Sequence, residues 1–453
     1  MKTNLQTSNI GKTFAKYVSL NVLSMLGLSA YILADTFFVA NNVGNAGITA
    51  MNIVIPFFSL LNGSGIILGI GGATRYSTAR GAGDKEKADR IFSEVTIVAL
   101  VLGLIWTLLG TIGAKFVCRA LGADDSVIEL SAEYLRAVSY FGIPFVFNHV
   151  LQAFVRNDGA PTLAMGAMLA SSFGNVIMDW FLMYPCGLGM FGAAFATGFS
   201  SMVSISVMSV LFLRKKNNFH FRRPRFSKED IAFVFKTGLP SFVTEMSNGV
   251  VILFFNNVIY KLAGNVGISA YSVVANIALV ALFCFNGVGQ GIQPLISYNY
   301  GAGKTKNVNK SLLYGAITVF CLGALFYLGF VFGREGLVTI FNKDGNAEMS
   351  TLGQQGILLY CISFFASGMN LVCCSYFASI NKQIFSFAIS ISRGMILPIG
   401  LVFLCSSMFG LTGVWLVIPI AEFVTLTVSG ILLYISKRQS KKSIELAPQV
   451  VAE

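Results

Sequence analysis

The sequence predicts an all-α integral membrane protein with twelve transmembrane helices, arranged as two repeated six-helix lobes around a central cleft. Two observations carry this prediction. Hydrophobic residues make up 55% of the 453 residues and charged residues only 11%, with a mean hydropathy of +0.71. A water-soluble domain of this length needs far more surface charge. In addition, several short motifs of the first half of the chain return in the second half.

The repeat is visible in glycine-containing motifs. Residues 44–50 (GNAGITA) return as residues 264–270 (GNVGISA), and residues 81–83 (GAG) return as residues 301–303. The offset is about 220 residues at both places, which indicates a duplicated unit of that length. Duplicated halves of several helices are a recurrent architecture of membrane transporters, with the substrate path at their interface.

Apolar runs close to the roughly 20 residues that span a bilayer recur along the whole chain. In the first half we expect helices at 14–38, 47–74, 94–117, 130–155, 162–184 and 191–213, and in the second half at 231–259, 267–296, 311–333, 353–378, 384–407 and 411–436. The expected organisation is an N-terminal lobe (1–213), a basic cytoplasmic linker (214–230), a C-terminal lobe (231–436) and a cytoplasmic tail (437–453).

The net charge of +12 is distributed unevenly. Most Lys and Arg residues fall at the helix ends that share a side with both termini, so the positive-inside rule predicts that both termini are cytoplasmic. The densest basic cluster lies within residues 214–228. We interpret it as a linker between the lobes that also contacts anionic lipid, and we expect no nucleic-acid partner.

Four carboxyl groups lie well inside predicted spans: Asp35, Asp179, Glu245 and Glu422. An ionised carboxylate in lipid is costly, so such a residue usually faces a cavity or a partner and marks an ion or substrate path. The alternative is a carboxyl that only ties two helices together, and for Glu422 both interpretations stay open.

Several polar residues of the first half are expected to lie at a similar depth in the membrane. Asp35 lies near the outer end of the first helix and Asp179 near the outer end of the fifth, while Thr197 lies about two turns into the sixth. Asn175 is four residues before Asp179 and shares its helix face. We therefore expect one coupling-ion pocket, whose oxygen atoms suit Na⁺ and whose paired carboxyls suit a proton.

The second half lacks this cluster, because its corresponding positions carry Phe255, Ile396, Gly400 and Ile418. It has its own acid, Glu245, near the middle of the seventh predicted helix. Glu245 is expected to face the substrate cleft or to form a second proton site. Tyr140, Asn148, Gln152 and Asn370 are further candidates for the cleft lining, with ordinary hydrogen bonding between helices as the alternative.

The chain resembles the multidrug and toxic compound extrusion (MATE) family, in particular its bacterial DinF-like and MepA-like branch. The residues that carry the resemblance are LADTFF at 33–38, QPLISYNYGAG at 293–303, and the Asn175-x-x-x-Asp179 pattern followed by Thr197. The resemblance covers about residues 10–440. In that branch an acid on helix one, an Asn and an Asp on helix five and a Thr on helix six form the ion site, which implies Asp35, Asn175, Asp179 and Thr197 here.

This resemblance implies a secondary antiporter of the bacterial inner membrane that exports organic cations or amphiphilic drugs in exchange for H⁺ or Na⁺. The implied partners are these small molecules and membrane lipids, and the chain is expected to be a monomer. No cofactor is expected, and no metal beyond a possible Na⁺ at the coupling site. The alternative function is a lipid-intermediate flippase, which would favour a cleft lined by arginine. An enzyme is not expected, because the chain has only 2 histidines and no hydrolase motif.

Overall fold

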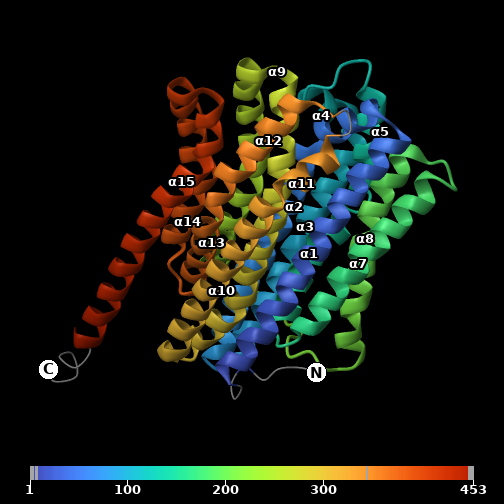
Figure 1. The fold of residues 1–453 in the computed structure, drawn as a ribbon. Helices are drawn as coiled ribbons and strands as arrows, with labels where there is room; N and C mark the ends of the chain where they lie inside the picture. Colours follow the sequence, from blue (N-terminus) through green and yellow to red (C-terminus); the bar gives the residue numbers. More distant parts are fainter. Residues whose placement is uncertain (1–4, 6–8, 343–344, 447–453) are drawn as a thin grey trace.

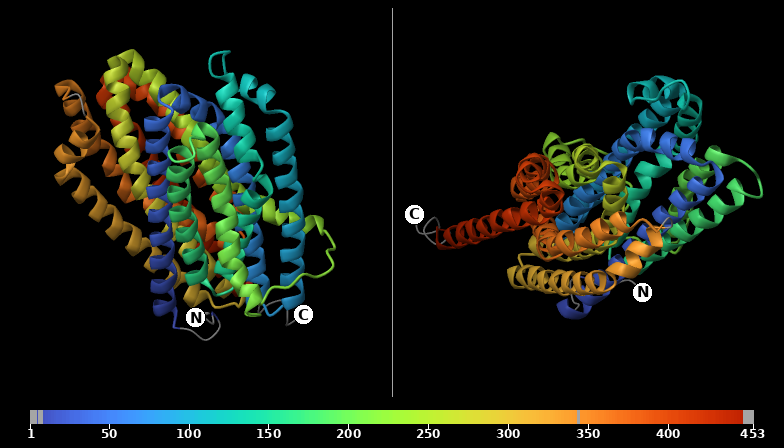
Figure 2. Two further views of the ribbon diagram at one scale, coloured as in Figure 1. Left: turned by 90° about the vertical axis from the view of Figure 1, so that its right-hand side faces the viewer. Right: turned by 45° about the horizontal axis from the view of Figure 1, so that its top comes forward.

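The computed structural model describes residues 5, 9–342 and 345–446. These residues form helices joined by short turns and one longer linker (Figure 1). The first residues of the first helix and the last residues of the last helix lie at the same end of the bundle (Figures 1 and 2). We call this the terminal end and the opposite side the far end.

The first half of the chain forms eight helices. In chain order they are α1 (Ile10–Asn42), α2 (Asn45–Gly81), α3 (Lys85–Ile112), α4 (Ala114–Ala120), α5 (Ile128–Ser139), α6 (Gly142–Asn157), α7 (Pro161–Met183) and α8 (Gly189–Leu213). At the start of α1 the side chain of Asn9 accepts hydrogen bonds from the free backbone N–H groups of Gly11 and Lys12, and α7 begins with proline, which lacks the N–H that a helix leaves unpaired there.

Within its described residues, the second half forms seven α-helices and two short helical segments of other geometry. They are α9 (Lys228–Gly301), α10 (Thr305–Phe332), α11 (Arg334–Phe341), α12 (Ala347–Tyr360), η1 (Cys361–Ser363), α13 (Phe364–Ser379), α14 (Gln383–Ile391), η2 (Ser392–Ile396) and α15 (Leu397–Leu446). The helix α9 starts inside the predicted linker, and α15 continues into the predicted tail. The segment η2 is a π-helical turn, in which one extra residue is accommodated within an otherwise regular helix.

Three glycines at positive φ produce tight helix reversals. Gly44 (φ 76) separates α1 from α2, Gly264 (φ 58) interrupts α9, and Gly410 (φ 58) interrupts α15. Glycine adopts this backbone region without strain because it has no Cβ. Gly44 and Gly264 are the first residues of the repeated motif, so the repeat in the sequence is also a repeat of this turn.

Nine helical segments among the described residues are long and apolar enough to cross a membrane. The number is ten if α5 and α6 are one span, because these two helices meet at an angle of 49°. The break follows from Gly142, which packs against α3 where a Cβ would clash, and from Pro144, which is tolerated only in the first turn of α6.

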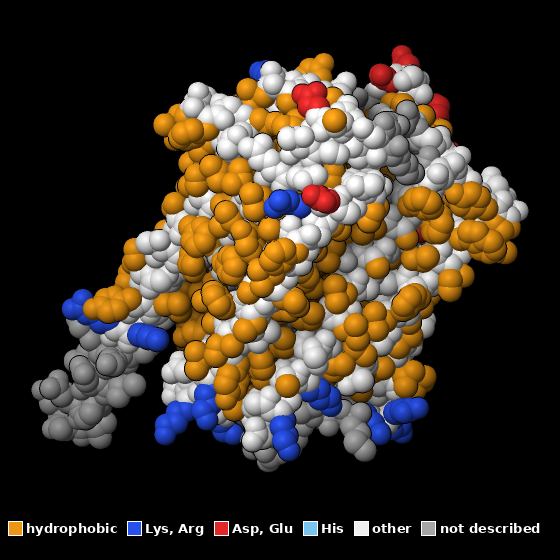
Figure 3. Space-filling view, viewed as in Figure 1, with side chains coloured by type: hydrophobic (Ala, Val, Ile, Leu, Met, Phe, Trp, Pro, Cys, Tyr) orange, Lys and Arg blue, Asp and Glu red, His pale blue; other side chains and the backbone are white. Residues whose placement is uncertain are grey.

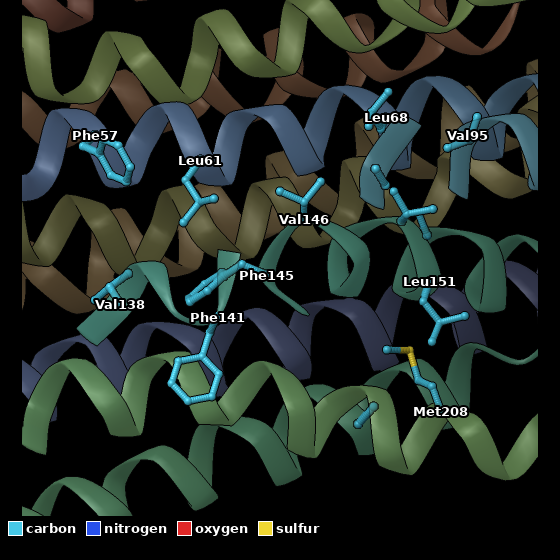
Figure 4. Packing of buried hydrophobic residues seen from close by; sticks show 14 of the residues in the cluster. Phe57, Leu61, Leu68, Val95, Val138, Phe141, Phe145, Val146, Leu151 and Met208 are labelled. Carbon is cyan, nitrogen blue, oxygen red and sulfur yellow. The ribbon is translucent and has the colours of Figure 1, made fainter. Parts of the chain in front are cut away.

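Buried hydrophobic side chains form two clusters. One draws its members from residues 39–234, and the other from residues 14–18 and 255–417. Figure 4 shows part of the first cluster, around Leu61, Phe145 and Val146. Lipid tails are as apolar as these side chains, so close van der Waals packing, rather than removal from water, holds such clusters together in a membrane.

The two copies of the Gly-Ala-Gly motif pack against each other at the terminal end. A Cβ atom on Gly81 of α2 would overlap the backbone of Tyr298 in α9, and one on Gly301 would overlap the backbone of Thr78 in α2. The helices α2 and α9 therefore touch backbone to backbone. At the terminal end this contact holds the two halves of the chain together.

The linker between α8 and α9 lies against the first half. Asp89 of α3 accepts a hydrogen bond from the backbone N–H of His220 at 3.1 Å, and Glu94 accepts one from Arg225 at 3.0 Å. Phe219 is fully buried between these anchors. The basic side chains of this segment are thus carried on a backbone that is fixed to α3.

The surface carries a broad hydrophobic band with charges at its two ends. In the face shown in Figure 3, hydrophobic side chains cover the middle, Lys and Arg gather at the terminal end, and most Asp and Glu lie toward the far end. This is the pattern of a helical protein that spans a bilayer with a basic side and an acidic side.

Candidate ion and substrate sites

Four polar side chains from three helices meet in the first half. Asp35 lies on α1, Asn175 and Asp179 on α7, and Thr197 on α8, and all four are buried. Asp179 is fully buried, with 0% of its surface exposed. The helix α7 packs against both α1 and α8, so its polar face is enclosed by the other two.

Asn175 connects the members of this group. With its amide oriented to satisfy both ends, its nitrogen donates to Asp179 Oδ2 at 3.1 Å and its oxygen accepts from the backbone N–H of Thr197 at 3.2 Å. Asp35 lies close enough to interact electrostatically with Asp179. Tyr31 and Tyr134 are also close enough to interact electrostatically with both carboxyls.

Two oxygen atoms in this cluster lack a hydrogen-bond partner: Oδ1 of Asp35 and Oδ1 of Asp179. Two buried carboxylates side by side repel each other, and each unpaired oxygen adds a desolvation cost. A proton on one carboxyl, or a cation between them, removes the repulsion and supplies the missing partner. The arrangement is therefore suited to binding and releasing a small cation.

The cluster is not a typical metal site. Among the described residues, no group of three or more His, Cys, Asp and Glu side chains is placed to hold a metal ion. A cation between Asp35 and Asp179 would need the neutral oxygens of Asn175 and Thr197 to complete its shell. Such a mixed oxygen set suits an exchangeable alkali ion better than a tightly held transition metal.

Glu245 lies on α9 and is joined to the first half by a hydrogen-bonded chain. Asn62 of α2 donates its Nδ2 to Glu245 Oε1 at 3.0 Å, and its Oδ1 contacts Nε2 of His149 on α6 at 2.5 Å. Because the Asn62 oxygen is an acceptor, the His149 nitrogen donates to it. The chain runs His149–Asn62–Glu245 across the boundary between the two halves.

No pattern in the sequence indicates the partners of Glu245. Asn62 is a single amide in an apolar run, and its pairing depends on the register between two helices from different halves. Gly63 sets that register, because a Cβ there would overlap the ring of Phe242 on α9. This close approach brings Asn62 within reach of Glu245.

The candidate cleft residues Tyr140, Asn148 and Gln152 do not lie on one continuous helix. Tyr140 falls in the break between α5 and α6 and is 56% exposed. Asn148 and Gln152 share one face of α6, and Oδ1 of Asn148 is buried without a partner. Because α5 and α6 meet at an angle of 49°, Tyr140 does not continue the face of α6 that carries Asn148 and Gln152.

Asn370 lies within the second half and belongs to a buried ion pair. Its Nδ2 donates to Glu422 Oε2 at 2.7 Å, and its Oδ1 accepts from Ser429 at 2.9 Å. The guanidinium of Arg393, in the π-helical turn η2, contacts both carboxylate oxygens of Glu422. Glu422 thus has full hydrogen-bond partners, unlike Asp35 and Asp179.

Comparison with known proteins agrees with this arrangement. A sequence model of the MatE family matches residues 21–181 and 240–404. Proteins named "Multidrug export protein MepA" from Staphylococcus saprophyticus and Staphylococcus aureus are 28% identical over 419 residues, which is 89% of this chain and 89% of each relative.

Solved structures share the fold over nearly the whole chain. An outward-facing MATE family transporter of the MOP superfamily superposes with a TM-score of 0.92 at 22% identity, covering 98% of this chain and all of that one. A MOP superfamily transporter from Pyrococcus furiosus, described as having a binding pocket of reverse polarity, gives 0.88 at 23% identity over 97% of this chain and 99% of its own.

The two segments matched by the family model make up well over half of the chain, and they fall one in each half of the repeat. The resemblance carried by the motifs around Asp35, Asn175 and Gln293 is therefore confirmed. The family consists of transporters and not of enzymes. This chain belongs to the MatE family of membrane transporters.

Proposed function

We propose that this protein is a secondary antiporter that exports organic cations or drugs across the bacterial inner membrane in exchange for H⁺ or Na⁺. The observation that carries the proposal is the buried Asp35–Asp179 pair with its two unpartnered oxygens. The relatives named as multidrug export proteins support the substrate class. Two six-helix lobes would expose the substrate path to each side of the membrane in turn.

The topology of the proposal has twelve membrane crossings. The ten spans counted with α5 and α6 as one become twelve when α9 and α15 each cross twice, turning at Gly264 and Gly410. Both termini then lie on one side of the membrane. Because Lys and Arg gather there, the positive-inside rule makes the terminal end cytoplasmic.

The ion and the drug would be coupled through the state of the lobes. The contacts at Gly81 and Gly301 close the terminal end, so the described conformation has its cytoplasmic side shut. In this state H⁺ or Na⁺ would bind at Asp35 and Asp179 from outside, and drug would be released. Transport follows if ion and drug favour opposite states of the two lobes.

Glu245 is the proposed partner of a cationic substrate. Its side chain is hydrogen-bonded to Asn62, which is neutral, so the carboxylate is available for a cation that displaces the amide. Because the same bond joins the two halves, its loss on substrate binding would also loosen their contact in the middle of the bundle. Binding of the substrate and separation of the two halves would then occur together.

We expect Glu245→Gln to lower the efflux efficiency of cationic dyes by at least about tenfold, while a neutral or zwitterionic substrate of similar size is much less affected. A charge partner that contributes about 1.4 kcal/mol accounts for a tenfold change. The measurement is the initial rate of efflux for a matched pair of substrates. Glu348→Gln, an exposed acid at the start of α12, is the control. An equal loss for both substrates would remove Glu245 from substrate recognition.

The polarity of the second half argues against the flippase alternative. The intramembrane arginine nearest to its middle, Arg393, is neutralised by Glu422 at an ion-pair distance of 2.5 Å. It is therefore occupied internally and does not offer a free cation to a phosphorylated lipid. In the middle of the bundle, the carboxyl of Glu245 and the amide of Asn62 are polar groups that a substrate can meet.

The function is tested by expressing the protein in a bacterial host that lacks its own drug pumps. We expect active efflux of ethidium, abolished by collapse of the pH or the Na⁺ gradient. Vesicles with only one of the two gradients then identify the coupling ion. Absence of efflux for every cationic dye tried, with the protein correctly inserted, contradicts the proposed substrate class.

A further inference from the structure

One buried arginine lies between the two halves without a carboxylate partner. Arg156, near the end of α6, is 5% exposed, and its terminal nitrogen donates to Asn21 Oδ1 of α1 at 3.1 Å and to Gln290 Oε1 of α9 at 2.6 Å. Its Nε has no hydrogen-bond partner. Both acceptors are neutral amides.

Arg156 is the most buried arginine among the described residues, and two less buried arginines do have a carboxylate partner. Arg75 is paired with Asp230 at 2.7 Å, and Arg393 is paired with Glu422. Within residues 9–342 and 345–446, no carboxylate lies within ion-pair distance of Arg156, whereas the guanidinium stays protonated in proteins. A buried charge without a counterion costs several kcal/mol, so its retention calls for a function.

The position of Arg156 indicates that function. One helical turn closer to the terminal end, Gln293 of α9 donates to Thr74 Oγ1 of α2 at 2.9 Å and accepts from Asn157 of α6 at 3.0 Å. Beyond this layer, the Gly-Ala-Gly motifs bring α2 and α9 into backbone contact. We call these three layers the seal, and Arg156 is its layer nearest the middle of the membrane.

The second layer of the seal is made of amide and hydroxyl groups. Chains of such groups conduct protons when water reaches them, and their oxygens accept a small cation. A transporter that uses a cation gradient loses its driving force if this cation crosses the closed side. A fixed positive charge in a narrow passage repels protons and cations, as arginine does in water-selective pores.

We propose that Arg156 is an electrostatic barrier that keeps H⁺ and Na⁺ from leaking through the closed cytoplasmic side. Asn21 and Gln290 hold the guanidinium across the boundary of the halves without neutralising it. When the halves separate at this side, Arg156 loses Gln290 and the barrier opens together with the seal. This proposal builds on the proposed ion coupling, although a leak is measurable without any drug.

The test uses purified full-length protein in lipid vesicles without drug. A step in outside pH or Na⁺ is imposed at a fixed membrane potential, and cation entry is followed with an internal dye. We expect Arg156→Gln, which keeps donors for Asn21 and Gln290 but removes the charge, to raise passive cation entry by at least about tenfold. Passive anion entry is expected to stay at the wild-type level.

Two further variants separate charge from shape. Arg156→Lys keeps the charge with a different geometry and is expected to stay close to wild-type tightness. The double variant Arg156→Gln/Gln290→Lys returns a cation to the same layer from the other half and is expected to restore it. A tight Arg156→Gln variant, or one that leaks cations and anions alike, overturns the proposal, as does a leak in Arg156→Lys equal to that in Arg156→Gln.

Failure of the substrate proposal gives a different result. If wild-type protein exports no cationic dye but Arg156→Gln still leaks cations selectively, the barrier stands and the substrate class falls. If the wild-type protein exports cationic dyes and Arg156→Gln leaks no more than wild type, the substrate class stands and the barrier falls.

Discussion

Asp35→Asn and Asp179→Asn are each expected to reduce ion-driven drug export to the level of empty vesicles. Each substitution keeps the size of the side chain but removes the charge that attracts H⁺ or Na⁺ into the cluster. In each variant a single carboxyl remains, without the second negative charge that would share a cation with it or strengthen its hold on a proton. The measurement is drug accumulation in vesicles under an imposed gradient.

These variants should fold normally. Removing one of two neighbouring buried carboxyls relieves repulsion and leaves fewer unpartnered oxygens, so thermal stability should stay the same or rise. Asp125→Asn is the matched control, because Asp125 is an exposed carboxyl paired only with Arg119 at the surface. Normal gradient-driven export by both Asp35→Asn and Asp179→Asn would remove the coupling role from this cluster.

Glu422→Leu is expected to lower the thermal stability strongly, whereas Asp35→Asn and Asp179→Asn are expected to leave it unchanged or raise it. The substitution leaves Arg393 buried without a counterion and removes the side-chain acceptor of Asn370. Breaking a buried ion pair in this way costs about 3–5 kcal/mol. Thermal unfolding in detergent is expected to show the loss, because it occurs with or without an ion gradient.

The double variant Arg393→Met/Glu422→Leu tests whether the pair itself causes that loss. Replacing both charges by apolar side chains of similar size leaves no unpaired charge, so most of the stability should return. If the two single losses simply add in the double variant, the ion pair is not what stabilises this part of the second half.

The sequence was most informative where a local rule decides the structure. The glycines at 44 and 264 begin a repeated motif and occupy the same left-handed turn in both halves. The i, i+4 spacing of Asn175 and Asp179 predicts that they share one helix face, and depth along the helices predicts that they lie at the level of Asp35 and Thr197. Helix geometry alone determines such relations.

The remaining contacts depend on packing between helices that are distant in the sequence. Asn62 reaches Glu245 because Gly63 lets α2 approach α9, and the helix pattern of either segment alone does not contain this register. Arg393 reaches Glu422 from a π-helical turn, which shifts the side-chain direction that regular spacing predicts. The break between α5 and α6 likewise moved Tyr140 away from Asn148 and Gln152.

The two halves therefore use their buried acids in different ways. In the first half Asp35 and Asp179 lie together with unpartnered oxygens, whereas in the second half Glu422 is paired with Arg393. The first arrangement can gain or lose a cation, and the second is stable as it is. On the basis of this asymmetry within a duplicated fold we propose one coupling-ion site.

The most direct test of this account is drug-driven ion movement in vesicles that contain no initial ion gradient. A cationic drug is added on one side of the membrane of vesicles that contain the wild-type protein. H⁺ or Na⁺ is then expected to move in the direction opposite to the drug, although no ion gradient exists at the start. The double variant Asp35→Asn/Asp179→Asn should still bind the drug but move no ion. Equal ion movement by the double variant and the wild type would contradict the assignment of the coupling site to Asp35 and Asp179.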